Sequence, residues 1–208
     1  KLNHSQITLS EWFRFYIDIN KPSADGRKGN WSINTLKNRE SVFRDYIDPS
    51  IGHIRLDRLT LTIYQKSFIE KYKDTLKPST LRLYHKFVVI ALNAAIKHDK
   101  IDKNPIIDAT LPLDREVQED KFISIKELKT VLDYVNEVEN ITNKVAVFTL
   151  AYTGIRVGEL RALRWKNLDF TNNKIQVYAT YHDAYTITKG KNKRIIPVDT
   201  SIIEQLKE

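Results

Sequence analysis

Arg156 and Glu159 stand three residues apart at the start of a predicted helix, and their side chains suit the binding of a phosphate group. The apolar run 145–152 precedes them, and Gly154 supplies the backbone freedom that ends one helix and reverses the chain. A guanidinium at the start of the next helix matches two phosphate oxygens, and the free N–H groups nearby also favour an anion. We therefore interpret Arg156 as a phosphate ligand that Glu159 holds in position.

An ordinary amphipathic helix with a solvated arginine has the same spacing. Apolar residues at helical intervals predict a face turned toward the core, here Val157, Leu160 and Leu163. Arg156 and Glu159 lie off that stripe. Spacing alone does not separate a phosphate ligand from a solvated arginine.

A second cluster of chemically active side chains is basic and contains Lys189, Lys191 and Lys193. It lies between segments 185–188 and 194–198, which alternate as strands and predict a hairpin with the lysines at its tip. Such a tip is either a loop that keeps the protein soluble or a probe that enters a nucleic acid groove with a lysine at its front.

Two predicted helices in the first half begin with polar and basic residues, which suit phosphates and the base edges of the major groove. The candidate DNA contacts are Asn34, Lys37, Asn38, Arg39, Lys77, Ser79, Thr80, Arg82 and Lys86, with Tyr84 and His85 on the same stretch. Helix capping followed by a solvated face explains these residues equally well. No side chain is assigned to a particular base.

The charge distribution also favours a polyanionic partner. The chain carries a net charge of +8, of which residues 1–108 contribute +7 and residues 109–208 only +1. A polyanion is therefore expected to bind mainly the first half, while a basic surface that serves solubility alone is the alternative.

Several other kinds of chemistry are missing from the sequence. The absence of cysteine excludes disulfides, zinc–thiolate sites and thiol catalysis, and the five histidines show no paired metal-binding spacing. Segment 189–194 lacks the ending of a P-loop, and no Gly-x-Ser-x-Gly elbow occurs. We predict no metal and no cofactor. The lack of a long apolar run or a signal-like start predicts a soluble cytoplasmic protein without membrane contact.

Four predicted helices make residues 1–108 a compact all-helical domain. They cover residues 8–20 with Ser10 as cap, 32 to the break at 49–52, 60 or 62 to 72, and 78–96. The residues expected in the core are Leu9, Trp12, Phe13, Tyr16 and Ile17 in the first helix, and Leu83, Phe87, Ile90, Leu92 and Ala94 in the fourth.

Residues 109–120 are predicted as a linker, because prolines and a charged run interrupt the periodicity there. Residues 121–208 predict an α+β domain, mostly helical with a three-stranded antiparallel sheet. A capping-box pattern at Ser124 opens its first helix, and strands are expected at 174–180, 185–188 and 194–198. The last helix, capped at 199–201, stops after about two turns, so we expect the chain to be incomplete at its C-terminus.

These two stretches together resemble the tyrosine recombinases, which include phage and conjugative-transposon integrases. Residues 153–160, followed by 163–165 and Asp169, look like the first active-site box of that family. Residues 189–198 look like its catalytic β-hairpin, which ends in a similar Arg-x-x-Pro. An α-helical core-binding domain, a linker and a mixed catalytic domain are also the family's layout, here with the catalytic domain only in part.

The resemblance implies a role for each matching residue. Arg156 corresponds to the first catalytic arginine, which binds the scissile phosphate and stabilises charge as phosphorus becomes five-coordinate. Lys189 corresponds to the hairpin lysine that protonates the departing 5′ oxygen, and Lys191 is the neighbouring alternative. Glu159 corresponds to the acidic position that supports the arginine.

The sequence departs from the family where it ends. Members carry a second box, His-x-x-Arg, then another histidine or tryptophan and finally the nucleophilic tyrosine, and none of these appears in its expected place. The tyrosines near the hairpin are interpreted as strand residues: Tyr178, Tyr181 and Tyr185. We therefore expect this segment to bind DNA without cleaving it.

The resemblance implies a fragment of a site-specific recombinase, an integrase of a mobile element or prophage. Its partners would be duplex DNA at an attachment core site and further copies of itself in a tetramer, with excisionase and a host DNA-bending protein as possible additions. The core-binding and catalytic domains would hold duplex DNA from opposite sides. A non-catalytic DNA-binding protein and a basic interaction protein indifferent to DNA are the alternatives.

Overall fold

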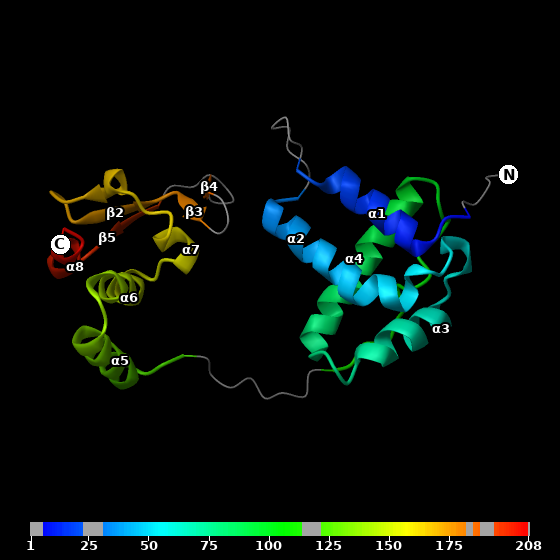
Figure 1. Ribbon diagram of the computed structural model, residues 1–208, viewed down its shortest axis with the longest axis horizontal. Helices are drawn as coiled ribbons and strands as arrows, with labels where there is room; N and C mark the ends of the chain where they lie inside the picture. Colours follow the sequence, from blue (N-terminus) through cyan, green and yellow to red (C-terminus); the bar gives the residue numbers. More distant parts are fainter. Residues whose placement is uncertain (1–5, 23–30, 114–121, 182–184, 188–193, 208) are drawn as a thin grey trace. The chain divides into compact units, whose positions relative to one another are not determined.

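The computed structural model describes residues 6–22, 31–113, 122–181, 185–187 and 194–207. The chain divides into two compact units, Lys1–Gln118 and Glu119–Glu208, each described by itself (Figure 1). The division falls inside the stretch predicted as a linker, although Thr110 is still held on the first unit, where its N–H donates to Gln65 Oε1 over 3.1 Å. The domain limits stay a prediction.

The regular elements of the first unit's described residues are helices, and one isolated antiparallel bridge joins Thr8 to Arg55. Its elements are α1 (Leu9–Asn20), α2 (Ile33–Val42) continued by the π-helix η1 (Phe43–Gly52), the 3₁₀-helix η2 (Leu56–Arg58), α3 (Leu61–Tyr64) continued by the π-helix η3 (Gln65–Glu70), and α4 (Pro78–Lys97). In the described part of the chain, no helix is long and apolar enough to span a membrane.

The cap of helix α1 lies two residues before the predicted one. Thr8, not Ser10, caps it: the Glu11 N–H donates to Thr8 Oγ1 over 3.2 Å, and the Thr8 N–H donates to Glu11 Oε2 over 2.7 Å. The prediction of Ser10 was wrong because Ser10 already lies within the helix, while Thr8 has the extended backbone of a cap. The predicted stripe of α1 is buried as expected: Leu9, Trp12, Phe13, Tyr16 and Ile17.

The second helix passes through Pro49 rather than breaking there. Its π-helical continuation ends after Gly52, so the predicted break at 49–52 begins too early. Proline removes one backbone donor from a helix. Next to Pro49, the Ser50 hydroxyl donates to the carbonyls of Tyr46 and Ile47 in the preceding turn.

Helix α4 has the predicted bounds to within a residue, but a different face is buried. Leu83 and Ile90 are 52% and 41% exposed, which contradicts their predicted core positions. Leu83 lies two positions, or about 200°, around the helix from buried Leu81. The core-facing residues of α4 are Leu81, His85, Phe87, Val88, Ala91, Leu92 and Ala95. The Trp12 indole donates to the Ala91 carbonyl over 2.9 Å and fixes α1 on α4.

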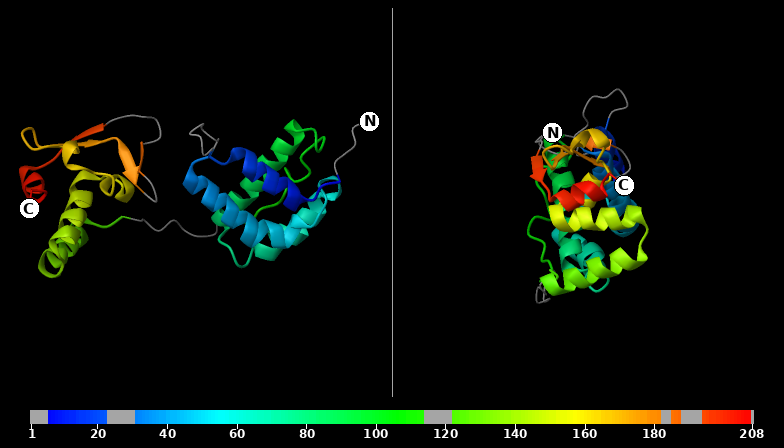
Figure 2. Two further views of the ribbon diagram at one scale, coloured as in Figure 1. Left: turned by 45° about the horizontal axis from the view of Figure 1, so that its top comes forward. Right: turned by 90° about the vertical axis from the view of Figure 1, so that its left-hand side faces the viewer.

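The second unit combines helices with two small sheets. Its elements are α5 (Ile125–Val138), α6 (Ile141–Thr153), α7 (Val157–Leu160), the 3₁₀-helix η4 (Trp165–Asn167), β1 (Leu168–Asp169), β2 (Lys174–Val177), β3 (Ala179–Tyr181), β4 (Tyr185–Ile187), β5 (Arg194–Pro197) and α8 (Thr200–Gln205). Helix α6 lies between α5 and the sheet layer (Figure 2). Ser124 and Glu127 form the predicted capping box of α5.

A three-stranded antiparallel sheet is present, as predicted, in the order β1-β2-β5, but β1 takes the place expected for strand 185–188. Among the described residues, β4 and β5 do not pair as the predicted hairpin requires. Strand β5 pairs with β2, with Ile196 opposite Ile175, and β4 pairs with β3. The hairpin prediction was wrong because the segment expected to be one strand is interrupted at Tyr178 and provides partners for both later strands. The buried core beneath comprises Ile155, Ile175 and Val177.

Candidate functional site

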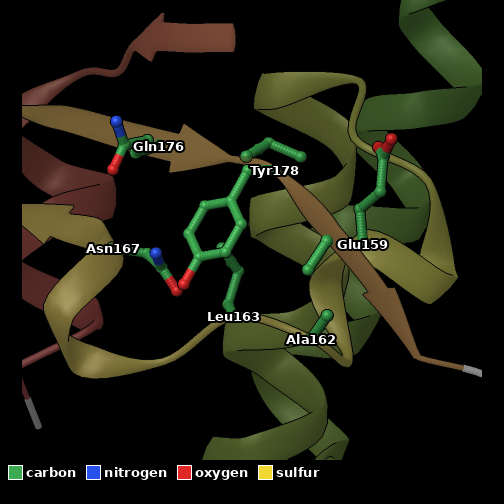
Figure 3. Close-up of a pocket in the computed structure, with 8 residues that line it drawn as sticks. Glu159, Ala162, Leu163, Asn167, Gln176 and Tyr178 are labelled. Atoms are coloured by element: carbon green, nitrogen blue, oxygen red, sulfur yellow. The ribbon is translucent and has the colours of Figure 1, made fainter. Parts of the chain in front are cut away.

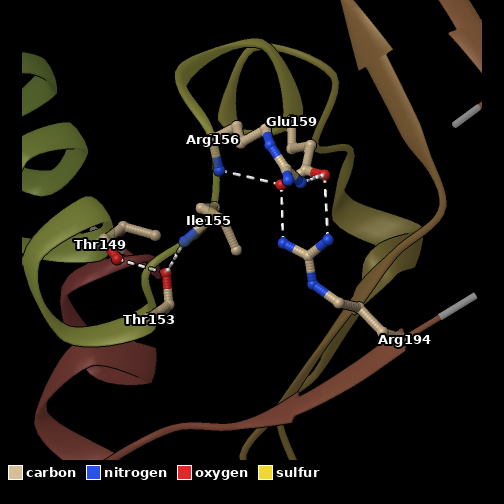
Figure 4. Close-up of polar contacts among 6 residues, drawn as sticks. All are labelled: Thr149, Thr153, Ile155, Arg156, Glu159 and Arg194. Atoms are coloured by element: carbon tan, nitrogen blue, oxygen red, sulfur yellow. Dashed lines mark hydrogen bonds and ion pairs between the residues drawn. The ribbon is translucent and has the colours of Figure 1, made fainter.

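The turn before Arg156 has the geometry that its sequence predicts. Helix α6 ends at Thr153, and Gly154 adopts a left-handed φ of 63° while its N–H donates to the Leu150 carbonyl over 3.0 Å. The Ile155 N–H donates to Thr153 Oγ1 over 3.4 Å, and the Ile155 side chain is buried. These contacts fix the backbone from which the Arg156 side chain projects (Figure 4).

Helix α7 is a single turn rather than the longer helix expected. Arg156 is its N-cap, with extended backbone, and the helix ends at Leu160. Val157 is 61% exposed, which contradicts its predicted core position, while Ala162 is buried. Because the helix is so short, Ile155 before it and Ala162 after it take the core positions that a longer helix would give to Val157.

Glu159 is the buried centre of the site. Its side chain is 3% exposed, and its Oε2 accepts the Arg156 backbone N–H over 2.8 Å. Its Oε1 is 3.3 Å from Arg156 Nη1. The structure therefore brings together the two residues that spacing singled out, and places the acid inside and the guanidinium outside.

Arg194, at the start of β5, is the site residue that sequence reasoning missed. Its Nη1 donates to Glu159 Oε1 over 3.0 Å and its Nη2 to Glu159 Oε2 over 2.7 Å (Figure 4). This is the parallel two-bond geometry in which arginine binds a carboxylate most strongly. The only signal in the sequence was the arginine of the Arg-x-x-Pro pattern, and no local spacing connects it to Glu159.

One carboxylate and two guanidiniums leave the cluster with one net positive charge. Hydrogen bonds from Arg194 are the main cause that lowers the pKa of Glu159, and the Arg156 N–H adds to it. Glu159 in turn raises the pKa of Arg194. The Arg156 side chain is 80% exposed, whereas that of Arg194 is 42% exposed. The positive charge open to an anion is therefore that of Arg156.

A hollow beside Glu159 is too tight for a water molecule. Its lining includes Leu163, Asn167, Gln176 and Tyr178, and the Tyr178 ring points toward Asn167 (Figure 3). The Arg164 backbone N–H donates to Oδ1 of buried Asn167 over 3.0 Å, and this bond holds the start of η4 beside the hollow. Glu159 also lines this hollow, and its carboxylate points away from Tyr178 (Figure 3).

The predicted basic tip lies outside the described residues, so Lys189, Lys191 and Lys193 have no place in this geometry. Of the tyrosines interpreted as strand residues, Tyr181 is in β3, Tyr185 is in β4, and Tyr178 lies between β2 and β3.

The first unit presents most of its candidate DNA contacts on two helix starts. Asn34, Lys37 and Asn38 are exposed on α2, and Ser79 and Lys86 are exposed on α4. Lys77 is the N-cap of α4 and Thr80 lies in its first turn. A hollow of about 180 Å³ between the two helices is lined by Thr35, Asn38, Arg39, Val42, Leu83 and Tyr84.

For three further candidates the structure shows which group of the protein they contact. Arg39 packs its guanidinium 4.2 Å from the centre of the Phe87 ring, and burial lowers its pKa. Arg82 Nη1 donates to the Pro112 carbonyl over 2.8 Å. His85 is buried, with Nδ1 3.0 Å from the Tyr64 hydroxyl. The prediction that it lies on the polar face of this helix was therefore wrong.

Comparisons with known proteins agree with this architecture. The sequence matches the Phage integrase family over residues 121–208 and the Phage integrase, N-terminal SAM-like domain over residues 24–71. It is 23% identical over 172 residues to an integrase of Saccharopolyspora erythraea, covering 82% of this chain and 37% of the relative. It is 25% identical over 196 residues to a XerC-like tyrosine recombinase of Caldanaerobacter subterraneus subsp. tengcongensis, covering 84% and 49%.

A solved structure has the same fold. The Tn1549 transposon integrase in complex with transposon right end DNA superposes with a TM-score of 0.78 at 22% identity, covering 97% of this chain and 64% of that chain. The present chain spans about half the length, or less, of the curated relatives that it matches first. The chain belongs to the phage integrase family of tyrosine recombinases.

Proposed function

We propose that this chain binds duplex DNA as part of a site-specific recombinase that cuts and rejoins DNA through a 3′-phosphotyrosyl intermediate. The observation that carries the proposal is the exposed Arg156 guanidinium, fastened at its backbone to buried Glu159 in a chain of this family. A planar guanidinium that projects from a fixed backbone suits a single backbone phosphate.

In this mechanism Arg156 binds two non-bridging oxygens of the scissile phosphate. The oxygen of a deprotonated tyrosine bonds to phosphorus as the bond between phosphorus and the 5′ oxygen breaks. The departing 5′ oxygen takes a proton, which we assign to Lys189. Charge on the phosphate oxygens grows in the five-coordinate state, so a preorganised cation stabilises it more than the ground state. The ester keeps the bond energy, so rejoining requires neither a metal nor a high-energy cofactor.

These 208 residues are proposed to bind DNA without cutting it. None of the five histidines is followed three residues later by arginine, so the second active-site box of the family is missing from this sequence. The net charge of +7 on residues 1–108 supports DNA binding by the first unit. We further propose a tetramer on two duplexes for the complete recombinase, with excisionase and a DNA-bending protein as additional partners.

Duplex binding by the 208-residue chain tests the DNA partner. Fluorescence anisotropy should show affinity that falls steeply with salt. In the double variant Lys37→Gln with Lys86→Gln, the plot of log association constant against log salt concentration should become less steep by about two units of slope. Lys66→Gln with Lys103→Gln, which removes two exposed lysines elsewhere on the first unit, is the matched control. Binding that changes neither with salt concentration nor in the Lys37→Gln, Lys86→Gln variant contradicts the proposed contact surface.

Covalent trapping tests the chemistry. A longer protein that contains this sequence and a downstream tyrosine should form an adduct with a nicked suicide substrate. Arg156→Ala should abolish the adduct, while its duplex affinity falls by about ten-fold and most of the binding free energy remains. Equal adduct yield from Arg156→Ala would overturn the role of Arg156. Tight binding with no adduct from the unmutated protein would instead favour a non-catalytic DNA-binding protein.

A further inference from the structure

Two guanidiniums share one carboxylate at the site, and they share it unequally. Arg194 occupies both oxygens of Glu159, at 3.0 and 2.7 Å. The Arg156 guanidinium reaches only Oε1, at 3.3 Å, and 80% of its side chain stays exposed. Arg156 is therefore attached to Glu159 mainly through its backbone N–H, at 2.8 Å.

A buried carboxylate requires a strong partner, because its desolvation is otherwise uncompensated. Among the described residues, the side-chain cations that contact Glu159 are Arg194 and Arg156. If Arg194 were absent, the Arg156 guanidinium would be drawn inward onto both oxygens, since the two-bond geometry would then be open to it. An arginine so engaged has fewer donors for a phosphate, and its charge is neutralised.

We infer that Arg194 is a positioning residue that satisfies Glu159 and thereby keeps the Arg156 guanidinium outward and free to bind a phosphate. The inference rests on the proposed function only for the identity of the anion as a DNA phosphate. Arg194 suits this role because β5 holds its backbone opposite Val177 in the sheet. Its removal changes the charge around Glu159 without removing a backbone hydrogen bond.

Duplex binding by variants of the 208-residue chain provides the first test. Arg194→Gln should weaken binding about ten-fold, close to the effect of Arg156→Ala, although Arg156 is still present. Arg194→Lys keeps the charge but not the planar guanidinium, so its duplex affinity should lie between those of Arg194→Gln and the unmutated chain. Lys166→Gln removes one exposed positive charge from η4 of the same unit and should change affinity less than two-fold.

The decisive variant is Glu159→Gln combined with Arg194→Gln. With no buried carboxylate to attract it, Arg156 should face outward again, and affinity should recover to within about three-fold of the unmutated chain. A merely structural role of Arg194 predicts further loss in the double variant. Affinity that stays as low as in Arg194→Gln overturns the inference.

Side-chain NMR separates this inference from the proposed function. The Arg156 Nε–Hε signal, identified by its loss in Arg156→Ala, should shift in Arg194→Gln and exchange more slowly with water, and it should return toward its original position in the double variant. An unmoved signal in a folded Arg194→Gln chain overturns the inference even where DNA is bound. If Arg156→Ala binds duplex as well as the unmutated chain, the proposed role of Arg156 fails, while the NMR result still decides the role of Arg194.

Discussion

At the scale of single residues, the site depends on how one buried acid is satisfied. Glu159 accepts two bonds from Arg194, one from the Arg156 backbone and a longer one from Arg156 Nη1. Each of these donors favours the ionised carboxylate, which offsets the cost of burying it. The consequence is that the protonation state of Glu159 is coupled to the stability of the second unit.

We predict that acid destabilises the second unit through Glu159. Its folded pKa is lowered from an ordinary value of 4.5, so its stabilising effect is complete above that value and is lost as pH falls through the folded pKa. Thermal unfolding, followed by second-unit amide signals at pH 6 and pH 3, should show a loss larger by about 1–2 kcal/mol than in Glu159→Gln. Equal losses in both proteins contradict this coupling.

His85 predicts a second pH effect, in the first unit. Burial lowers its pKa below the ordinary 6.5, so the native state favours the neutral ring. Stability should be complete above pH 6.5 and should fall as pH drops below it, because the unfolded chain then binds the proton more readily. Urea unfolding of first-unit amide signals at pH 7.5 and pH 5 measures the effect. His85→Asn, which keeps a polar partner for Tyr64 but does not titrate, should lose the pH dependence.

At the scale of elements, the turn at Gly154 connects the helix α6 to the Arg156 backbone. Its positive φ of 63° is a conformation that residues with a Cβ rarely adopt, and an added Cβ would meet nothing within 4 Å. The cost of substitution is therefore conformational rather than steric. Any residue that relaxes this φ would also move the N-cap of α7.

We predict that Gly154→Ala destabilises the second unit by about 1–2 kcal/mol. Gly154→Asn should cost less, because asparagine tolerates the left-handed region. Thermal unfolding of the two variants, read from second-unit signals, gives the comparison. If both variants are as stable as the unmutated chain, the turn relaxes to another conformation at no cost in free energy.

Several features defined by local spacing were predictable, whereas those defined by distant pairing were not. The Ser124 capping box and the buried stripe of α1 follow from neighbouring residues, and the structure confirms both. The pairing of β4 with β3 depends on an interruption at Tyr178 that alternation of side chains does not reveal. Arg194 was missed for the same reason, since 35 positions separate it from Glu159.

At the scale of the whole molecule, the two units differ in how much apolar surface they bury. The fully buried side chains with the largest volumes all lie in the first unit, among them Trp12, Tyr64 and Phe68. The second unit buries smaller residues and exposes large ones in its described part: Phe122, Ile123, Ile125, Val131, Tyr134, Val138, Ile141, Tyr152, Val157, Trp165, Tyr181 and Ile195. Burial of apolar area is the main stabilising contribution to folding, so the units should differ in stability.

We predict that the second unit unfolds first on heating. Amide hydrogen exchange at neutral pH should show the slowest protons in α1 and α4, and those of α6 and β2 should exchange at least ten-fold faster. Duplex DNA should slow exchange in both units if both contact it. Uniform protection across the chain would show that the units unfold together.

The bond between Glu159 and Arg194 has a consequence for how this protein can change over generations. Loss of the arginine alone leaves the buried carboxylate to draw in the Arg156 guanidinium, and loss of the glutamate alone leaves an unmatched cation at the sheet edge. Either single step is harmful, so the two positions are expected to be exchanged together or kept together. Homologous sequences that lack one of these residues should therefore lack the other as well.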